Sequence, residues 1–161
     1  MAIRTIREAG DEILRGSAKP VTEMTPRISA AISDMYETMY DAAGVGLAAP
    51  QIGIRKRFFV VDVPDEDGSS HKYTMINPEI LETSGEQEGF EGCLSVPGKH
   101  GTVIRPMRVR VRAQGEDMQW YEVEAEGLLA RAILHENDHL NGILYTDLVK
   151  GELLDNDEEE E

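Results

Sequence analysis

The sequence predicts an α+β fold in which mostly antiparallel strands pack around a central metal-binding helix, with another helix near the N-terminus. Two segments show helical periodicity of apolar residues, over residues 26–43 and 126–142. Segments of alternating or β-branched residues lie between them and are joined by short turns, which is typical of hairpins. Strands grouped in this way favour the α+β class over a doubly wound parallel sheet, in which strands and helices alternate.

The composition is that of an ordinary globular domain. The chain has 161 residues, of which 40% are hydrophobic and 29% are charged. The N-terminus lacks the apolar core of a signal peptide, and no apolar run is long enough to span a membrane. We therefore expect a cytoplasmic protein with a single domain over residues 1–150. The acidic segment 151–161 is expected to be a disordered tail.

The charge argues against nucleic acid as a partner. The formal net charge is −15, whereas a protein that grips a phosphate backbone needs a basic face. We therefore expect no direct binding of nucleic acid.

The segment 26–43 is predicted to be an amphipathic helix. Thr25 suits the N-cap, and Pro26 suits the first helical position, where no backbone N–H is needed. Gly44 follows where a glycine commonly ends a helix. The face that packs in the core is predicted by an apolar stripe at helical spacing, which consists of Ile28, Ile32, Met35 and Met39.

Strands are predicted over residues 57–63 and 72–81, the second interrupted or ended near Pro78. A hairpin is predicted over residues 108–126, because apolar and charged residues alternate on both sides of a turn. Its three arginines face the same way as its glutamates, which indicates a charged outer face rather than a site for an anionic ligand.

The segment 126–142 carries the residues that point most directly to chemistry. His135 and His139 lie one helical turn apart, and Glu136 lies on the neighbouring apolar stripe. A buried glutamate beside two buried histidines is costly unless a cation joins them. The pattern therefore predicts a divalent metal held by the histidines, with the glutamate as the base.

The third metal ligand must come from another segment. The candidates are His71, His100, a carboxylate and Cys93. His71 lies in a polar turn and is expected to be exposed. Cys93 is the single cysteine, so it cannot form an internal disulfide, and glycines near it allow a close approach of the backbone. A thiolate with two imidazoles would leave a fourth position open, as catalytic sites require.

Three stretches together resemble the motifs of the peptide deformylase family in their usual order. They are GVGLAAPQ over residues 44–51, EGCLS over 91–95 and HENDH over 135–139. The similarity extends over residues 4–148. It implies a catalytic domain that removes the formyl group from the N-terminal methionine of newly made polypeptides, using a metal.

The resemblance also implies roles for single residues. The metal ligands would be Cys93, His135 and His139. A metal-bound water would be the nucleophile and Glu136 its general acid–base. The family metal is usually ferrous iron, and Zn²⁺, Ni²⁺ or Co²⁺ would also suit these ligands. The oxyanion of the intermediate would be stabilised by the backbone N–H of Leu94 and the side-chain amide of Gln51.

Substrate contacts are expected from two places. An extended peptide is expected to pair with the main chain of the first motif, at Val45, Gly46 and Leu47. An apolar pocket for the methionine side chain is expected to involve Leu129 and Ile133.

Three further positions bear on partners and affinity. Asp138 is expected to pair with Arg105 and so to orient the metal site. His100 stands near a position where many family members carry an arginine, a change that either alters peptide affinity or is simply tolerated. Some members end in a basic helix suited to the ribosome. Because this chain turns acidic after residue 150, only a transient contact with the ribosome is expected.

Two other functions are compatible with the helix motif. A zinc endopeptidase would use the same histidines and glutamate but has no role for the EGCLS stretch. A binding module with a structural metal would need neither a base nor an open coordination position. Cleavage of formyl-methionyl peptides, of internal peptide bonds or of neither distinguishes the three.

Overall fold

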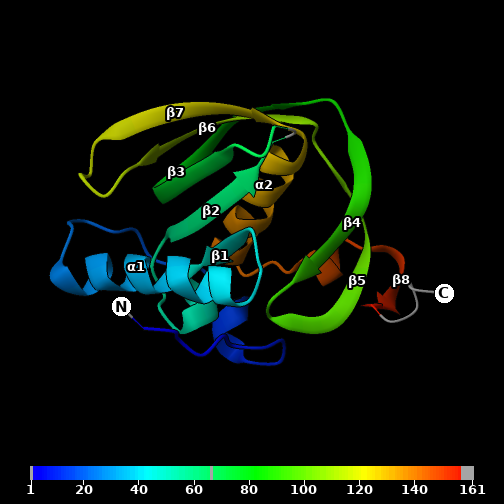
Figure 1. The fold of residues 1–161 in the computed structure, drawn as a ribbon, viewed down its shortest axis with the longest axis horizontal. Helices are drawn as coiled ribbons and strands as arrows, with labels where there is room; N and C mark the ends of the chain where they lie inside the picture. Colours follow the sequence, from blue (N-terminus) through cyan, green and yellow to red (C-terminus); the bar gives the residue numbers. More distant parts are fainter. Residues whose placement is uncertain (1, 66, 157–161) are drawn as a thin grey trace.

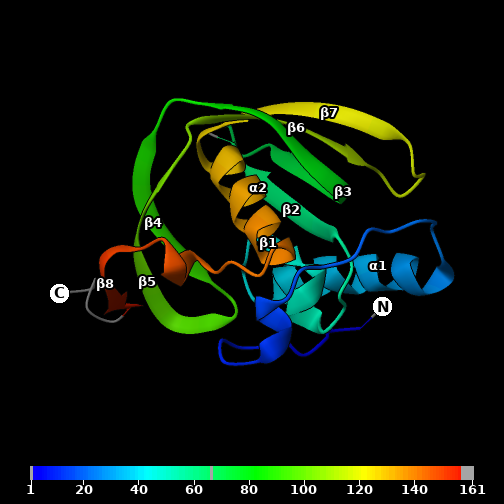
Figure 2. The same cartoon turned by 180° about the vertical axis from the view of Figure 1, so that it is seen from behind.

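The fold is built on two antiparallel sheets (Figures 1 and 2). The computed structural model describes residues 2–65 and 67–156. The larger sheet has the strand order β1 (Gly46–Ala48), β2 (Phe58–Pro64), β3 (Ser70–Ser84), β6 (Arg108–Gln114) and β7 (Trp120–Glu126). The smaller sheet consists of β4 (Gln87–Cys93), β5 (Val96–Arg105) and β8 (Lys150–Asp155).

Helix α2 (Gly127–Leu140) lies between the two sheets (Figure 1). It packs against strands of the larger sheet, and a hydrogen bond from His135 to Glu91 joins it to β4. Helix α1 (Pro26–Asp41) covers the other side of the larger sheet. This arrangement confirms the predicted α+β class. No helix in the described part of the chain is long and apolar enough to cross a membrane.

Strand β2 shows how one sheet serves two cores. Successive side chains of a strand point to opposite faces, so a strand buried on both faces is apolar throughout. Phe58 and Val60 pack with the apolar side of α1, whereas Phe59 and Val61 pack with α2. All four side chains are fully buried. The strand therefore fixes both helices relative to one another.

The start of α1 is as predicted, but its end is different. The hydroxyl of Thr25 accepts a hydrogen bond from the N–H of Ile28 at 3.2 Å, which confirms the N-cap. At the other end Ala43, not Gly44, takes the left-handed conformation, with φ of 57°. Gly44 lies close to Leu94, because a Cβ at residue 44 would be 2.9 Å from the end of the Leu94 side chain, which would have to shift.

Strand β3 is interrupted near Pro78, as predicted, but it does not end there. Asn77 has a left-handed φ of 52°, and the pairing with β6 shifts register between Ile76 and Glu79. The side chain of Asn77 compensates by bonding both the N–H and the carbonyl of Val21, each at 2.8 Å. The irregularity around Pro78 therefore costs the strand little.

The predicted hairpin is confirmed by β6 and β7. Arg108 lies opposite Glu126, and Arg110 lies opposite Glu124. The inward-facing residues Val109, Val111 and Ala125 are buried beneath α2.

The C-terminal segment differs from the expectation of a disordered tail over residues 151–161. Residues 150–155 form β8 on the edge of β5, with Asp155 opposite Lys99 and Leu154 opposite His100. An ion pair between Lys99 and Asp155 reinforces the pairing. The chain therefore does not leave the fold at residue 150, and residues 157–161 lie outside the described part. The single domain over residues 1–150 stays a prediction.

Candidate metal centre

Three potential metal ligands meet at the junction of α2 and β4. Cys93 is the last residue of β4, and His135 and His139 lie on the buried face of α2. Their ligand atoms all lie within 4.8 Å of one another. The sulfur of Cys93 is 3.4 Å from Nε2 of His139. Tertiary structure thus brings together the three residues that the motifs singled out.

The other histidines considered as ligands lie elsewhere. Nε2 of His71 is 3.0 Å from a carboxylate oxygen of Asp65, in the turn after β2. Nδ1 of His100 is 2.9 Å from the side-chain oxygen of Asn156, after β8. Neither ring belongs to the cluster around Cys93.

Glu91 is the central acceptor behind the candidate metal ligands, and sequence reasoning missed it. Its carboxylate accepts a hydrogen bond from Nδ1 of His135 at 2.8 Å. Arg105 donates to it from Nε and Nη2 at 2.8 and 2.9 Å, and Arg131 donates at 2.7 Å. Burial alone would raise the pKa of Glu91, but the bonds from Arg105 and His135 lower it to about 2.

The position of Glu91 explains its contact with His135. Glu91 lies two residues before Cys93 on the same strand, a spacing that directs both side chains toward one face. Histidines that bind metals usually donate their other N–H to a carboxylate or carbonyl. Applied to the residues around Cys93, that rule could have identified Glu91 from the sequence. With Nδ1 engaged by Glu91, His135 is left with Nε2 to offer a metal.

The predicted pair of Asp138 and Arg105 is confirmed. Nη1 of Arg105 donates to Asp138 at 2.6 Å. Arg105 thereby joins the carboxylate next to His139 to the carboxylate that bonds His135. Arg131 was not anticipated, although it lies on α2 only four residues before His135 and is buried.

Glu136 lies buried beside β1. A Cβ atom at Gly46 would collide with its carboxylate, so only glycine allows this approach. Burial raises the pKa of Glu136 to about 7, although the charge of His135 opposes the rise. Its Oε1 has no hydrogen-bond partner within residues 2–65 and 67–156. This carboxyl group is therefore placed to form a hydrogen bond with a molecule bound in the pocket.

The chemistry of the donor set fits a divalent cation. Burial lowers the pKa of His139 to about 3, and the charge of His135 lowers it further. Burial also disfavours charge on His135, but bonding to Cys93 and Glu91 and the charge of Glu136 raise its pKa to about 10. The negative groups thus draw a positive charge into the cluster. One sulfur and two imidazoles are ligands that borderline divalent metals accept.

Gln51 lies in a short 3-10 helix, Ala49–Ile52, and its side chain is held at both ends. The side-chain oxygen accepts a hydrogen bond from the N–H of Ala48 at 2.9 Å. The amide nitrogen donates to the hydroxyl of Ser95 at 3.0 Å and lies 3.6 Å from the sulfur of Cys93. Gln51 is 1% exposed. Its N–H groups are therefore fixed next to the cysteine loop.

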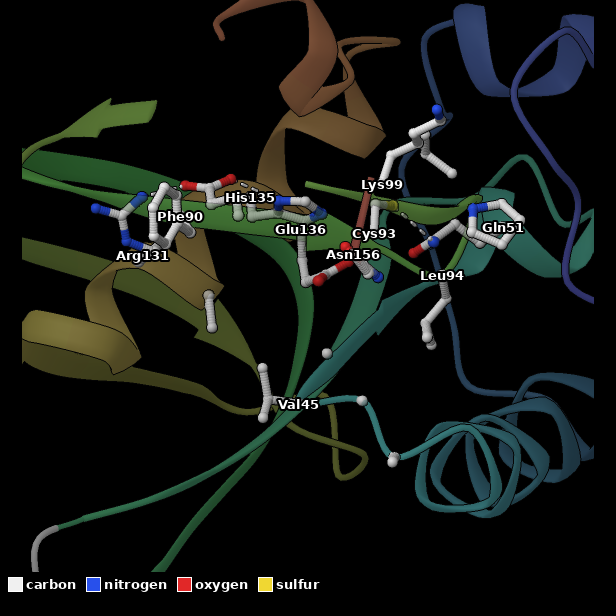
Figure 3. Close-up of a pocket in the computed structure, with 18 of the residues that line it drawn as sticks. Val45, Gln51, Phe90, Cys93, Leu94, Lys99, Arg131, His135, Glu136 and Asn156 are labelled. Carbon is white, nitrogen blue, oxygen red and sulfur yellow. Dashed lines mark hydrogen bonds and ion pairs between the residues drawn. The ribbon is translucent and has the colours of Figure 1, made fainter. Parts of the chain in front are cut away.

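A pocket opens beside these groups, and α2 forms one wall of it (Figure 3). The lining includes Leu128 and Ala132 rather than the predicted Leu129 and Ile133. Ile133 is fully buried in the core with the larger sheet, and Leu129 packs against the same core. Leu128 and Ala132 precede His135 by two turns and one turn, so they share its face. The prediction of Leu129 and Ile133 took the neighbouring stripe of α2, so it was wrong about the pocket lining.

The first motif contributes the opposite wall. Of the three residues expected to contact the peptide, Val45 and Gly46 line the pocket and Leu47 does not. Leu47 is fully buried and packs with α1, because adjacent residues of a strand face opposite ways. The remaining lining includes Phe90, Leu94, Lys99 and Asn156 (Figure 3). Phe90, Lys99 and Asn156 were not anticipated from the sequence.

Known proteins match nearly the whole chain. The family model described as "Polypeptide deformylase" matches residues 3–153. A peptide deformylase of Agathobacter rectalis is 57% identical over 155 residues, which are 96% of this chain and 95% of that protein. The crystal structure of peptide deformylase from Thermotoga maritima has a TM-score of 0.87 and 43% identity, and the match covers 92% of this chain and 99% of that one.

A second solved structure is similar at lower identity. It is peptide deformylase from Ehrlichia chaffeensis in complex with actinonin, with a TM-score of 0.89 and 35% identity. The match covers 93% of this chain and 90% of that one. The residues matched by the family model include every ligand candidate and Glu136.

Proposed function

The chain belongs to the polypeptide deformylase family, and from this premise we propose how its own residues carry out the reaction. The protein is a metal-dependent hydrolase that removes the formyl group from the N-terminal methionine of polypeptides. Hydrolysis breaks the bond between the formyl carbon and the methionine nitrogen and releases formate and a free amine. The residues must therefore move one proton from water to that nitrogen.

We propose that Cys93, His135 and His139 hold one divalent ion, which is ferrous iron in the usual form of the family. The convergence of their ligand atoms within 4.8 Å supports this assignment. When bound, such an ion lowers the pKa of a water and polarises the formyl carbonyl. Zn²⁺, Ni²⁺ and Co²⁺ suit the same ligands, so the choice of metal must be measured.

Glu136 is the proposed proton carrier. It takes a proton from the attacking water and delivers it to the methionine nitrogen as the bond to the formyl carbon breaks. Two observations support this role: the carboxylate is buried next to Gly46 on the pocket wall, and its Oε1 has no partner among the described residues. Arg105 and Asp138 stabilise the helix turn that carries it.

Gln51 and Leu94 are the proposed oxyanion donors. The formyl oxygen gains negative charge as water attacks, and fixed N–H donors stabilise that charge most effectively when they need not reorganise. The amide of Gln51 is fixed in this sense, because Ala48 holds its oxygen at 2.9 Å and directs its nitrogen toward the cysteine loop. The backbone N–H of Leu94 follows directly after Cys93 in that loop.

The two walls of the pocket suit an extended peptide that begins with methionine. Leu128 and Ala132 offer an apolar surface for the methionine side chain. β1 is an edge strand of the larger sheet, so the backbone near Val45 and Gly46 is suited to pairing with a peptide. Backbone pairing accepts many sequences after the methionine, as this substrate class requires.

We infer that formylated nascent chains meet the protein in the cytoplasm, where translation produces them. The single cysteine supports this inference, because an unpaired thiol ligand suits a reducing compartment. Contact with the ribosome would be transient and would not use nucleic acid, since the chain is acidic.

The observation that carries the proposal is a cysteine–histidine–histidine cluster beside a pocket that is lined by Cys93, His135 and the buried Glu136. The test is anaerobic hydrolysis of formyl-Met-Ala-Ser with ferrous or nickel ion, for the wild type and Glu136→Gln. We expect turnover to fall about 10²–10⁴-fold in the variant, because general acid–base catalysis is lost while the metal stays bound. Absence of turnover by a fully metallated wild type would contradict the proposal, and cleavage of internal peptide bonds would favour an endopeptidase.

A further inference from the structure

The smaller sheet extends to the mouth of the pocket through β8. This strand lies on the edge of β5, where Lys150 pairs with Thr102 and Leu154 with His100. Lys150 also forms an ion pair with Glu88 of β4 at 3.2 Å. These contacts hold the segment in place, so the residue that follows β8 has a defined position. That residue is Asn156, which lines the pocket together with Lys99 (Figure 3).

The side chain of Asn156 is oriented from behind by a buried histidine. Nδ1 of His100 lies 2.9 Å from the side-chain oxygen of Asn156, and His100 is only 6% exposed. The ring of His100 packs edge-on against Phe90, with the ring centres 5.2 Å apart. Phe90 lines the pocket as well. An amide whose oxygen is engaged in this way retains two N–H donors for another partner.

The pocket lining contains both apolar and polar side chains, and Lys99 and Asn156 lie apart from α2 in the sequence. Leu128 and Ala132 of α2 are the apolar residues to which we assign the methionine side chain. Lys99 and Asn156 provide polar groups from the smaller sheet, and Asn156 is exposed. A peptide whose first side chain contacts Leu128 and Ala132 must continue outward, toward solvent. Its second residue then meets the polar side chains.

We propose that Asn156 binds the backbone of the substrate residue that follows the methionine, with its amide N–H donating to a backbone carbonyl. This inference deepens the proposed function and rests on it. A neutral amide suits the task, because every peptide presents a backbone carbonyl whatever its side chain. His100 is a positioning residue for this contact, since it holds the oxygen of Asn156.

The test compares two substrates that differ beyond the methionine. Formyl-Met-Ala-Ser contains the following residue, whereas formyl-methionine amide does not. For Asn156→Ala we expect KM for the tripeptide to rise about three- to tenfold, the loss typical of one hydrogen bond. We expect kcat for the tripeptide and both constants for the amide to stay within about twofold of the wild type, because the reacting groups are untouched.

Two further variants separate binding from structure. Asn156→Asp keeps an oxygen for His100 but has no N–H donor, so it should raise the tripeptide KM at least as much as Asn156→Ala. Glu152→Gln changes an exposed residue of β8 that does not line the pocket, and it should leave all constants unchanged. Unfolding temperature and metal content are measured for each variant to show that the fold and the metal centre are retained.

Each possible result either supports or overturns the inference about Asn156. A rise in the tripeptide KM alone supports the inference. Equal losses for both substrates, or no loss for either, would overturn it while the wild type still hydrolyses both. Failure of the metallated wild type on both substrates would instead overturn the proposed function, and this inference with it.

Discussion

Two groups of arginine–glutamate pairs in this protein have similar geometry and different surroundings. Around Glu91, the donors Arg105 and Arg131 lie at 2.7–2.9 Å, and all three side chains are at most 8% exposed. On the hairpin of β6 and β7, Arg110 pairs with Glu122 at 2.8 Å, but these side chains are 35% and 56% exposed. Their contact distances alone do not distinguish the two groups.

Burial, rather than contact distance, distinguishes the ion pairs around Glu91 from the solvated pairs of the hairpin. Water screens the hairpin charges, so their attraction is weak. In the interior the same charges interact strongly, so removing one partner lowers the free energy of unfolding much more. The low pKa of Glu91 reflects this, because bonds from Arg105 and His135 outweigh its burial. The buried group can therefore hold the ring of His135 in one orientation, which the exposed group could not do.

Removing the central carboxylate should break the buried group most severely. Glu91→Leu leaves Arg105 and Arg131 buried without their common acceptor and leaves Nδ1 of His135 without a partner. We expect a loss of about 3–5 kcal/mol in the free energy of unfolding, measured by urea denaturation. Metal content should fall in parallel. If Glu91→Leu lowered the free energy of unfolding no more than a hairpin variant does, burial would not explain the difference between the two groups.

Removing one of the two buried arginines should have an intermediate effect. Arg131→Met keeps the aliphatic stem and leaves Glu91 paired with Arg105. We expect a loss of about 1–3 kcal/mol in the free energy of unfolding, and about 10–100-fold weaker metal binding in a chelator competition. Arg110→Met is the matched control, because it makes the same chemical change on the exposed hairpin. Equal metal affinity in both variants would contradict the coupling of Arg131 to His135 through Glu91.

A smaller effect is expected where a hairpin arginine lies over an aromatic ring. The guanidinium carbon of Arg112 lies 3.9 Å from the centre of the Trp120 ring. Trp120→Ala should therefore lower the free energy of unfolding by about 0.5–1 kcal/mol through the lost cation–π contact. Thermal denaturation of the Arg112→Ala and Trp120→Ala variants and of the double variant gives the coupling between the residues. If the losses of the two single variants add up to the loss of the double variant, the contact contributes nothing to stability.

The smallest effect is expected at Arg110, which pairs with both Glu82 and Glu122. Because these charges are exposed, Arg110→Met should change the unfolding midpoint only slightly in low salt. Raising the ionic strength should abolish even that difference, since salt screens exposed charges. A clear destabilisation that persists in high salt would place this pair with the buried group.

Local patterns predicted much of the fold. The helix over α1, its N-cap at Thr25 and the alternation of the hairpin depend on neighbours in the sequence, and the structure confirms them. The interruption of β3 near Pro78 was predicted. How the strand continues beyond it was not, because Asn77 bonds Val21, which lies far away in the sequence. The segment 151–155 was misjudged for a similar reason, since its partner strand is distant.

The candidate site shows the same division. Helical spacing singled out His135 and His139, and the resemblance to the family added Cys93; the structure brings the three together. Spacing alone could not choose between two neighbouring stripes of α2, so the expected pocket residues Leu129 and Ile133 belong to the core instead. Which stripe faces the pocket depends on where the two sheets lie, and that is a property of the assembled fold.

From the sequence, three motifs in their usual order were enough to identify the family and its reaction, and that resemblance implied which residues carry it. Only the tertiary structure decided that Glu91 joins two arginines to His135, and that Asn156 reaches the pocket from the end of β8. The physical reason is that a side chain's environment depends on residues distant in sequence. Burial and charge neutralisation exist only once those residues meet.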